Sequence, residues 1–153
     1  MRFLDNVLED FIQNAPETMA RAVYSAQRER SIGLGVMGMH SFLQSQNVPI
    51  ESVMAKVWNN KIFEHISKEA DRASKLLAEE RGACPDAEEV GAKERFSNKT
   101  SIAPTASISI ICGNSSPGIE PYAANSFTQK TLSGSFTVKN KNNFNSRRLC
   151  STS

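Results

Sequence analysis

The first clear pattern in the chain is a set of apolar residues that recur in pairs four positions apart. These residues are Phe3, Leu4, Val7, Leu8, Phe11 and Ile12. Such spacing places them on one face of a helix, so we predict an amphipathic helix over residues 3–12. Pro16 disfavours helical geometry at Ala15, and a second, more polar helix is expected from about Glu17 to the cluster Arg28, Glu29 and Arg30.

A second apolar series begins at Val53 and advances in steps of mostly four residues. Its further members are Val57, Ile62, Ile66, Ala70, Ala73 and Leu77. The series predicts a helix of about 30 residues over 49–81, in which Pro49 suits the first turn and Gly82 suits the end. An apolar stripe of this length indicates packing against a large partner surface.

The character of the sequence changes after Gly82. Residues 83–99 are charged and contain Pro85 and Gly91, which favours a connecting loop with one helical turn. Residues 127–132 and 135–138 are strand-like runs separated by Ser133 and Gly134, a pattern typical of a hairpin with a two-residue turn. Residues 140–153 are polar and without periodicity, so we expect them to be disordered.

Composition narrows the class of protein. The 153 residues suit one domain or part of a larger one. Eighteen basic and 16 acidic residues leave a formal charge of +2, which is too small to indicate a nucleic-acid or membrane partner. No apolar run approaches the roughly 20 residues needed to span a bilayer, and the first ten residues carry acids where a signal peptide would be apolar. We therefore expect a cytoplasmic protein.

The residue types that bind metals are sparse and scattered. Cys84, Cys112 and Cys150 lie far apart, without the spacing of a zinc site, so we interpret them as reduced structural thiols. His65 has no second ligand at helical spacing and is expected on a polar helix face. No Ser/His/Asp arrangement and no paired carboxylates are visible.

Gly33, Gly35 and Gly38 form a GxGxxG motif, which in dinucleotide-binding proteins brings backbone amides close to a pyrophosphate. The preceding residues do not resemble a buried parallel strand, and no strand ending in an acidic residue follows about 20 positions later. The motif is therefore interpreted as a glycine-rich helix start against which another element packs closely.

The segment from Pro104 to Ser109 combines small residues and hydroxyls. It can present successive backbone amides and the hydroxyls of Thr105 and Ser107 to an anion, best if it opens a helix. The alternative is a buried strand that includes Ile108, Ile110 and Ile111. Glu120, which precedes a proline in the sequence GIEP, can orient a ligand or cap a helix.

Taken together and in order, four segments resemble the C-terminal part of the barrel domain of ribonucleotide reductase large subunits. They are RFLDNV, RERSIGLGVMG, the long helix ending LAEERGACP, and APTASISIICGNSSPGIEPYAANSFTQKTLSGSF. The resemblance covers residues 1–139 and is most specific over 104–136. It implies an α/β fold, a half-barrel fragment of a ten-stranded α/β barrel with long amphipathic helices and a β-hairpin near the C-terminus.

In this family the PTAS loop and the helix that it opens bind the phosphates of the substrate. Carried onto this sequence, the resemblance implies a phosphate site at Thr105, Ala106, Ser107 and Ile108, with Pro104 fixing the approach. Many relatives have a hydroxyl residue at the position of Ile108, where a backbone amide can still serve. Ser109 and Glu120 are candidates for supporting the site.

The family replaces the ribose 2′-hydroxyl with hydrogen, beginning from a thiyl radical on a cysteine in an NLCxE-like loop and using a cysteine pair as reductant. This sequence contains no such loop, so the isolated chain is expected to be inactive and to bind no cofactor or metal. For the whole enzyme, the resemblance implies a ribonucleoside diphosphate substrate, a radical-generating small subunit with a di-iron site, and thioredoxin or glutaredoxin. Cobalamin is the less favoured cofactor.

Three hypotheses follow for the chain itself. The first is one fragment of a divided reductase gene interrupted after Lys139, with Met1 as an internal start, which assembles with the remaining fragments of the large subunit through exposed apolar helix stripes. The second is a stand-alone phosphate- or nucleotide-binding or interaction module. The third is an inactive truncated product.

Overall fold

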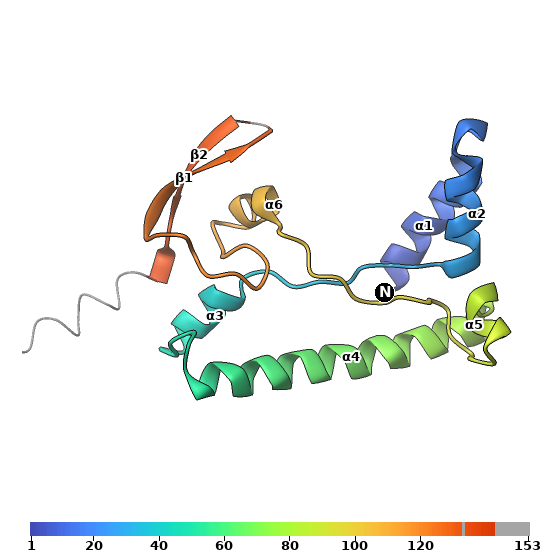
Figure 1. Cartoon of the computed structure of the whole chain (residues 1–153), viewed down its shortest axis with the longest axis horizontal. Helices are drawn as coiled ribbons and strands as arrows, with labels where there is room; N and C mark the ends of the chain where they lie inside the picture. Colours follow the sequence, from blue (N-terminus) through green and yellow to red (C-terminus); the bar gives the residue numbers. More distant parts are fainter. Residues whose placement is uncertain (133, 143–153) are drawn as a thin grey trace, which may run out of the picture. The chain divides into compact units, whose positions relative to one another are not determined.

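A computed structural model describes residues 1–132 and 134–142 (Figure 1). The chain divides into two compact units, which we call the helical unit (residues 1–34 and 61–101) and the hairpin unit (residues 35–60 and 102–153). The elements in chain order are α1 (Arg2–Asn14), η1 (Glu17–Met19), α2 (Ala20–Glu29), α3 (Met39–Ser45), α4 (Val53–Arg81), α5 (Pro85–Glu89), α6 (Ala106–Ile111), β1 (Ser126–Thr131) and β2 (Gly134–Lys139).

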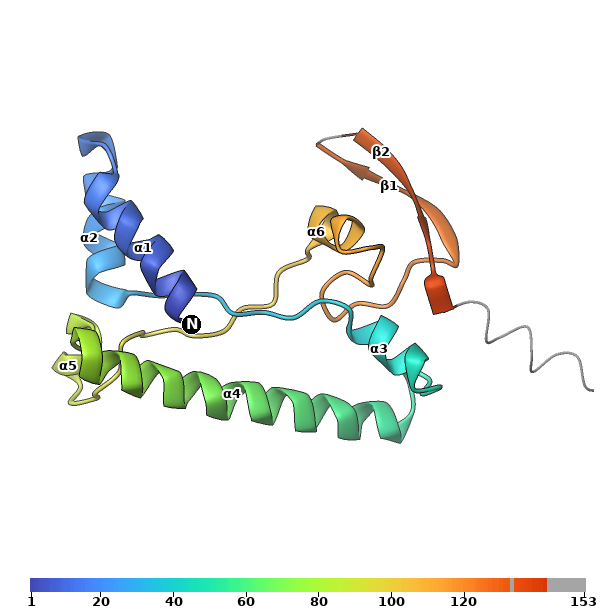
Figure 2. The ribbon, with the colours of Figure 1, turned by 180° about the vertical axis from the view of Figure 1, so that it is seen from behind.

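In the helical unit, α1 forms where the apolar spacing predicts a helix, but its most buried residue is a carboxylate. Asp5 is fully buried, whereas Phe3 and Val7 are 75% and 51% exposed. The amphipathic pattern therefore identifies the helix correctly and misidentifies part of the face that it buries. Figure 2 shows α1 packed beside α2.

Three arginines from distant parts of the sequence surround Asp5. Arg30 donates to its carboxylate at 2.8 Å, Arg81 at 2.7 Å and Arg95 at 3.1 Å. Burial alone would raise the pKa of Asp5, but the hydrogen bonds from the three guanidinium groups outweigh it and hold the pKa below its ordinary value. One carboxylate thus links α1 to the ends of α2 and α4 and to the segment after α5.

Arg95 also fixes the end of α4. Its Nη1 atom donates to the carbonyl oxygens of Arg81 and Gly82, both at 3.0 Å, and these are acceptors that a helix end leaves unpaired. The hydroxyl of Ser74, buried on α4, accepts from the backbone N–H groups of Arg95 and Phe96. The segment after α5 is therefore held along α4 by side-chain hydrogen bonds.

The long helix α4 begins at Val53, later than the predicted start at Pro49. Pro49 instead belongs to a turn in which the N–H of Ser52 donates to its carbonyl oxygen at 3.0 Å. The Ser52 hydroxyl then accepts from the N–H of Ala55, as an N-capping serine does. The predicted end is confirmed, since Gly82 follows the helix with a φ of +87°.

The loop after α4 contains the single helical turn predicted for it, α5. Arg28 of α2 pairs with Asp86 and Glu89 of α5, so ion pairs join these two helices. The close packing predicted for the glycine motif is also confirmed, since a Cβ atom on Gly33 would lie 2.9 Å from the Cβ atom of Ser101. Gly33 precedes a single parallel bridge between Leu34 and Thr100.

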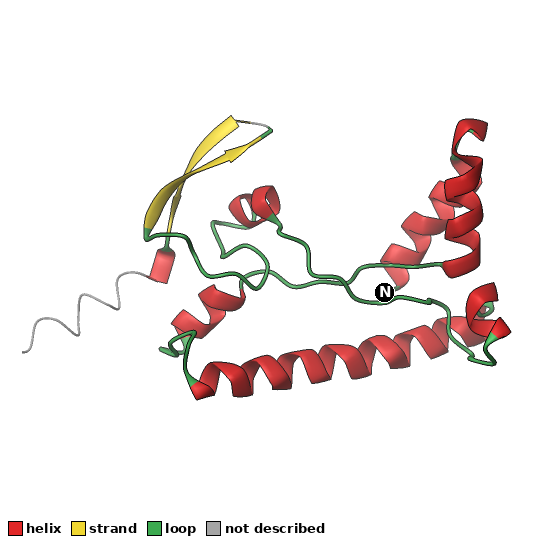
Figure 3. Ribbon diagram, in the orientation of Figure 1, coloured by secondary structure: helices red, strands yellow, loops and turns green. Residues whose placement is uncertain are grey.

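In the hairpin unit, β1 and β2 pair antiparallel from Ser126 opposite Lys139 to Thr131 opposite Gly134. The hairpin was predicted, but Gly134, which was expected in the turn, is instead the first residue of β2. Among the described residues these are the only named strands (Figure 3). They form no barrel, so the expected fold class is confirmed for the helices and the hairpin alone, as in a fragment. Residues 143–153 of the predicted disordered tail lie outside the described residues.

We predict that Asp5→Asn destabilises the chain by about 3 kcal/mol, because an amide cannot neutralise three buried or half-buried guanidinium groups. Urea unfolding followed by circular dichroism measures the loss. Asp10→Asn, an exposed carboxylate on the same helix, is the matched control and should change the free energy of unfolding by less than about 0.5 kcal/mol. Equal effects of the two substitutions would contradict the assigned role of Asp5.

The same carboxylate predicts an acid-sensitive stability. Because the native pKa of Asp5 lies below its ordinary value of 3.8, its ionised form stabilises the fold above that pH. This contribution should be lost as the pH falls below 3.8 and through the native pKa. The measurement is the unfolding free energy of the wild type and of Asp5→Asn between pH 7 and pH 2; the difference between them should shrink in acid. A constant difference would contradict the prediction.

Candidate functional site

The predicted phosphate segment lies in the hairpin unit, where it turns sharply into α6. Thr105 precedes the helix with φ 51° and ψ 33°, a left-handed conformation, and α6 runs from Ala106 to Ile111. Ile108 and Ile111 are 55% and 82% exposed, so the buried-strand alternative is wrong. The helix-opening geometry expected of an anion-binding segment is present.

This geometry leaves a row of backbone donors unpaired. Ser109 is the first residue of the segment whose N–H finds a helical acceptor, the carbonyl oxygen of Thr105 at 2.9 Å. The N–H groups of Ala106, Ser107 and Ile108 have no acceptor among the described residues, as expected for the first turn of a helix. Ser107 and Ile108 are exposed, so an incoming anion can reach their amides.

The turn at Gly118 holds the beginning of this segment. The Gly118 N–H donates to the hydroxyl oxygen of Thr105 at 2.8 Å. Gly118 has a φ of +46°, and a Cβ atom there would lie 2.9 Å from the carbonyl oxygen of Ala103. The Gly118 turn therefore contacts the segment at Ala103 and at Thr105, the residues on either side of Pro104.

The Gly118 turn is itself fixed by a network of hydroxyls. Ser41 of α3 and the buried Ser116 exchange hydrogen bonds, each hydroxyl accepting from the other residue's backbone N–H. The hydroxyl of Tyr122 contacts the Ser41 hydroxyl at 2.9 Å and donates to the carbonyl oxygen of Asn114. The Tyr122 N–H donates to Nδ1 of His40, and burial lowers the pKa of this histidine.

A cavity of about 210 Å³ opens between α6, the Gly118 turn and the hairpin. Its lining consists of Pro104, Ala106, Ser109, Ile110, Ser115, Pro117, Glu120, Phe127, Gln129 and Val138. The hydroxyl of Ser115 is buried there and has no hydrogen-bond partner among the described residues, although buried hydroxyls are normally paired. The cavity thus presents an unused donor and acceptor among largely apolar walls.

Apart from Thr105, which pairs with Gly118, the predicted site residues fall into two groups. Pro104, Ala106, Ser109 and Glu120 line the cavity, whereas Ser107 and Ile108 lie on the exposed side of α6. The Ser109 hydroxyl donates to the carbonyl oxygen of Ala106 and so belongs to the helix itself. Sequence reasoning missed the roles of Gly118 and Ser115; the glycine of the GIEP turn was a visible signal, whereas the unpaired serine gave none.

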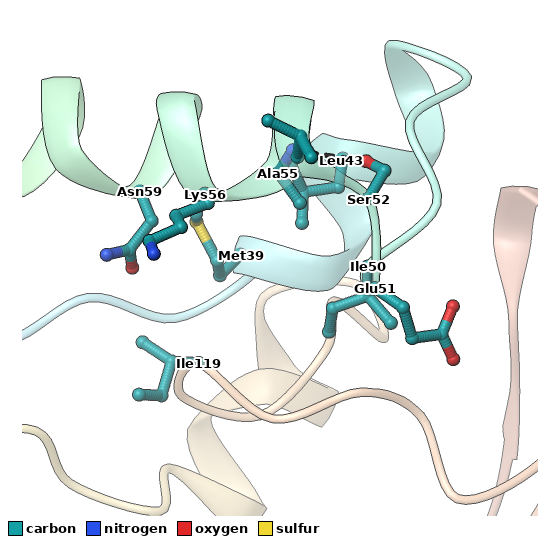
Figure 4. Close-up of a pocket in the computed structure, with 10 residues that line it drawn as sticks. Met39, Leu43, Ile50, Glu51, Ser52, Ala55, Lys56, Asn59 and Ile119 are labelled. Carbon is teal, nitrogen blue, oxygen red and sulfur yellow. Dashed lines mark hydrogen bonds between the residues drawn. The ribbon is translucent and has the colours of Figure 1, made fainter.

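A second cavity, a groove of about 410 Å³, lies in the hairpin unit beside the first turns of α4. Figure 4 shows its lining residues Met39, Leu43, Ile50, Glu51, Ser52, Ala55, Lys56, Asn59 and Ile119. Its walls are mostly apolar, and Ile119 of the Gly118 turn is 42% exposed there. Val53, which also lines the groove, is 81% exposed.

The cysteines do not gather into a redox or metal site within the described residues. Cys84 is buried at the start of α5 and Cys112 is exposed after α6, while Cys150 lies outside the described residues. Across residues 1–132 and 134–142, no three His, Cys, Asp or Glu side chains are placed to hold a metal ion. Nor does this part of the chain contain a helix long and apolar enough to cross a membrane.

Comparison with known proteins identifies the family to which this chain belongs. The chain matches the α subunit of the Actinobacillus ureae class Id ribonucleotide reductase with a TM-score of 0.81 and 34% identity, over 96% of this chain and 26% of that one. The profile of the family described as "Ribonucleotide reductase, barrel domain" matches residues 1–94 and 86–150. The chain therefore belongs to the ribonucleotide reductase barrel-domain family.

Viral and archaeal relatives support the same assignment. The ribonucleoside-diphosphate reductase large subunit of Invertebrate iridescent virus 3 is 52% identical over 91% of this chain, and that of Invertebrate iridescent virus 6 is 49% identical over 92%. The vitamin B12-dependent enzyme of Thermoplasma acidophilum is 40% identical over 87%. The chain spans only 22%, 14% and 17% of the lengths of these three relatives.

Two neighbouring serines give a matched test of the hydroxyl network. We predict that Ser115→Ala leaves the free energy of unfolding unchanged or raises it by up to about 1 kcal/mol, because it removes an unpaired buried hydroxyl. Ser116→Ala should lower it by about 1 kcal/mol, because the Ser41 N–H loses its acceptor. Thermal or urea unfolding of both variants measures the contrast. A larger loss of unfolding free energy for Ser115→Ala than for Ser116→Ala would contradict this prediction.

Proposed function

We propose that this chain is the part of a ribonucleoside-diphosphate reductase large subunit that supplies the loop binding the phosphates of the substrate. The observation that carries the proposal is the row of unpaired backbone N–H groups at Ala106, Ser107 and Ile108, directly after the left-handed turn at Thr105. The reaction of the whole enzyme would be the reduction of ribonucleotides to deoxyribonucleotides for DNA synthesis.

The chemistry of the loop suits a phosphate. Consecutive amides that point out of a first helical turn form hydrogen bonds with anionic oxygens, and an exposed Ser107 hydroxyl adds a further donor. Ile108 contributes its amide alone, since its side chain is apolar. Pro104 limits the backbone conformations of the residue before it and so restrains the chain where it enters the loop.

The radical chemistry would come from other parts of the large subunit. The 153 residues contain no NLCxE-like loop, and Cys84 and Cys112 lie on different units, one of them buried. We therefore propose that this chain turns over no substrate by itself and acts when assembled with the segments that carry the reactive cysteines. The largely apolar groove beside Ile119 and the exposed Val53 provide surfaces for such assembly.

The radical source in this proposal is a separate small subunit with a di-iron site, and thioredoxin or glutaredoxin would reduce the enzyme in the cytoplasm. The names of the relatives support a separate subunit. Those at 52% and 49% identity are called large subunits, whereas the vitamin B12-dependent relatives are 40% and 37% identical.

The test uses a chimaera in which this chain replaces the matching segment of the Invertebrate iridescent virus 3 large subunit. The unaltered chimaera should form deoxyribonucleotides in the assay of the parent enzyme. Ser107→Ala should raise the KM for a ribonucleoside diphosphate about fivefold, because about 1 kcal/mol of hydrogen bonding to phosphate is lost.

Ser126→Ala, an exposed serine at the start of β1, is the matched control and should leave the KM unchanged. A KM for Ser107→Ala equal to that of the control would remove Ser107 from the site. A chimaera that binds diphosphate normally after all of 104–108 is replaced by another loop sequence would overturn the proposed function.

A further inference from the structure

We propose that Thr105 and Gly118 are positioning residues, which together form a latch that sets the direction of the amides at Ala106, Ser107 and Ile108. This inference rests on the proposed function of the loop, and it assigns to Thr105 a role different from direct phosphate contact. The latch is the hydrogen bond from the Gly118 N–H to the Thr105 hydroxyl, with the close approach of Gly118 to the Ala103 carbonyl oxygen.

The backbone of Thr105 needs such a restraint. A φ of 51° is unfavourable for a β-branched residue, because its side chain crowds the neighbouring carbonyl oxygen. Conformations of this kind persist where surrounding contacts determine them. At Thr105 one such contact is made by its own side chain, since the hydroxyl accepts the Gly118 N–H at 2.8 Å.

Gly118 forms the other side of the latch, and any residue with a side chain would be strained there. Its φ of +46° lies in the left-handed region, and a methyl group would come within 2.9 Å of a backbone oxygen. The turn cannot simply move away, because Ser116, two residues earlier, is paired to Ser41 and the Gly38 N–H donates to the Ser116 carbonyl oxygen at 2.8 Å.

These contacts form a continuous path within the hairpin unit. Helix α3 holds Ser116, the turn that follows presents the N–H of Gly118, and that N–H fixes the side chain of Thr105. Thr105 in turn sets where α6 begins. Because donors that already point at an anion need not be ordered when it binds, a loosened latch should weaken phosphate binding while leaving the donors themselves present.

Two substitutions break the latch from opposite sides, and two more serve as controls. Thr105→Val removes the hydroxyl but keeps the shape, whereas Thr105→Ser keeps the hydroxyl. Gly118→Ala introduces the clash with Ala103. Gly91→Ala is its matched control. Gly91 also has a positive φ, +73°, but no atom of the described residues lies within 4 Å of the added methyl group.

The variants are placed in the iridescent virus chimaera, and the Kd for cytidine diphosphate is measured by equilibrium dialysis beside the thermal midpoint. Thr105→Val and Gly118→Ala should each weaken binding about fivefold or more. Thr105→Ser should bind within about twofold of the unaltered chimaera. Gly91→Ala should lower the thermal midpoint, because alanine is strained at a positive φ, yet leave the Kd unchanged.

Two results would overturn the latch. One is normal binding by Thr105→Val; the other is an equal loss of binding by Gly91→Ala and Gly118→Ala, which would mean that general destabilisation is the cause. The proposed function fails separately, if the unaltered chimaera binds no diphosphate at residues 105–108. In that case the hydrogen-exchange rate of the Gly118 amide still tests the latch. Thr105→Val should accelerate this exchange, because the amide loses its acceptor, whereas Thr105→Ser should leave the rate unchanged.

Discussion

The main constraint on this chain is the need to pair buried polar groups in a protein with a thin apolar core. Much of the described chain outside the helices has no β-partner, and side chains satisfy several of its backbone donors and acceptors. In the helical unit Arg95 and Ser74 do this around α4, and the buried carboxylate of Asp5 accepts from Arg95 in turn. In the hairpin unit the same task falls to Ser41, Ser116, Thr105 and Tyr122.

This way of building a loop has a functional consequence. A segment held by directed hydrogen bonds keeps one conformation, so the unpaired amides at the start of α6 can be oriented before a ligand arrives. The backbone N–H groups of residues 106–118 thus include two kinds of donor. Those used internally, such as the Gly118 N–H, hold the shape, whereas the amides of Ala106, Ser107 and Ile108 remain available.

Elements set by local pattern were predictable from the sequence, and contacts between distant residues were not. Apolar spacing and Gly82 located α1 and the end of α4, but the cap at Ser52 displaced the start of α4 from Pro49 to Val53. No periodicity reveals that Asp5 is buried, because its partners lie 25, 76 and 90 positions away. The candidate site followed from the order of its motifs and from a family resemblance that the comparisons confirm, while its pairing with Gly118 required the structure.

The most direct test of the account is a crystal structure of the chimaeric large subunit with a ribonucleoside diphosphate bound. Phosphate oxygens should lie at about 2.7–3.2 Å from the backbone nitrogens of Ala106, Ser107 and Ile108, with the Gly118 N–H still donating to Thr105. A diphosphate held elsewhere, with these three nitrogens contacting only solvent, would contradict the proposal that this chain supplies the phosphate-binding loop.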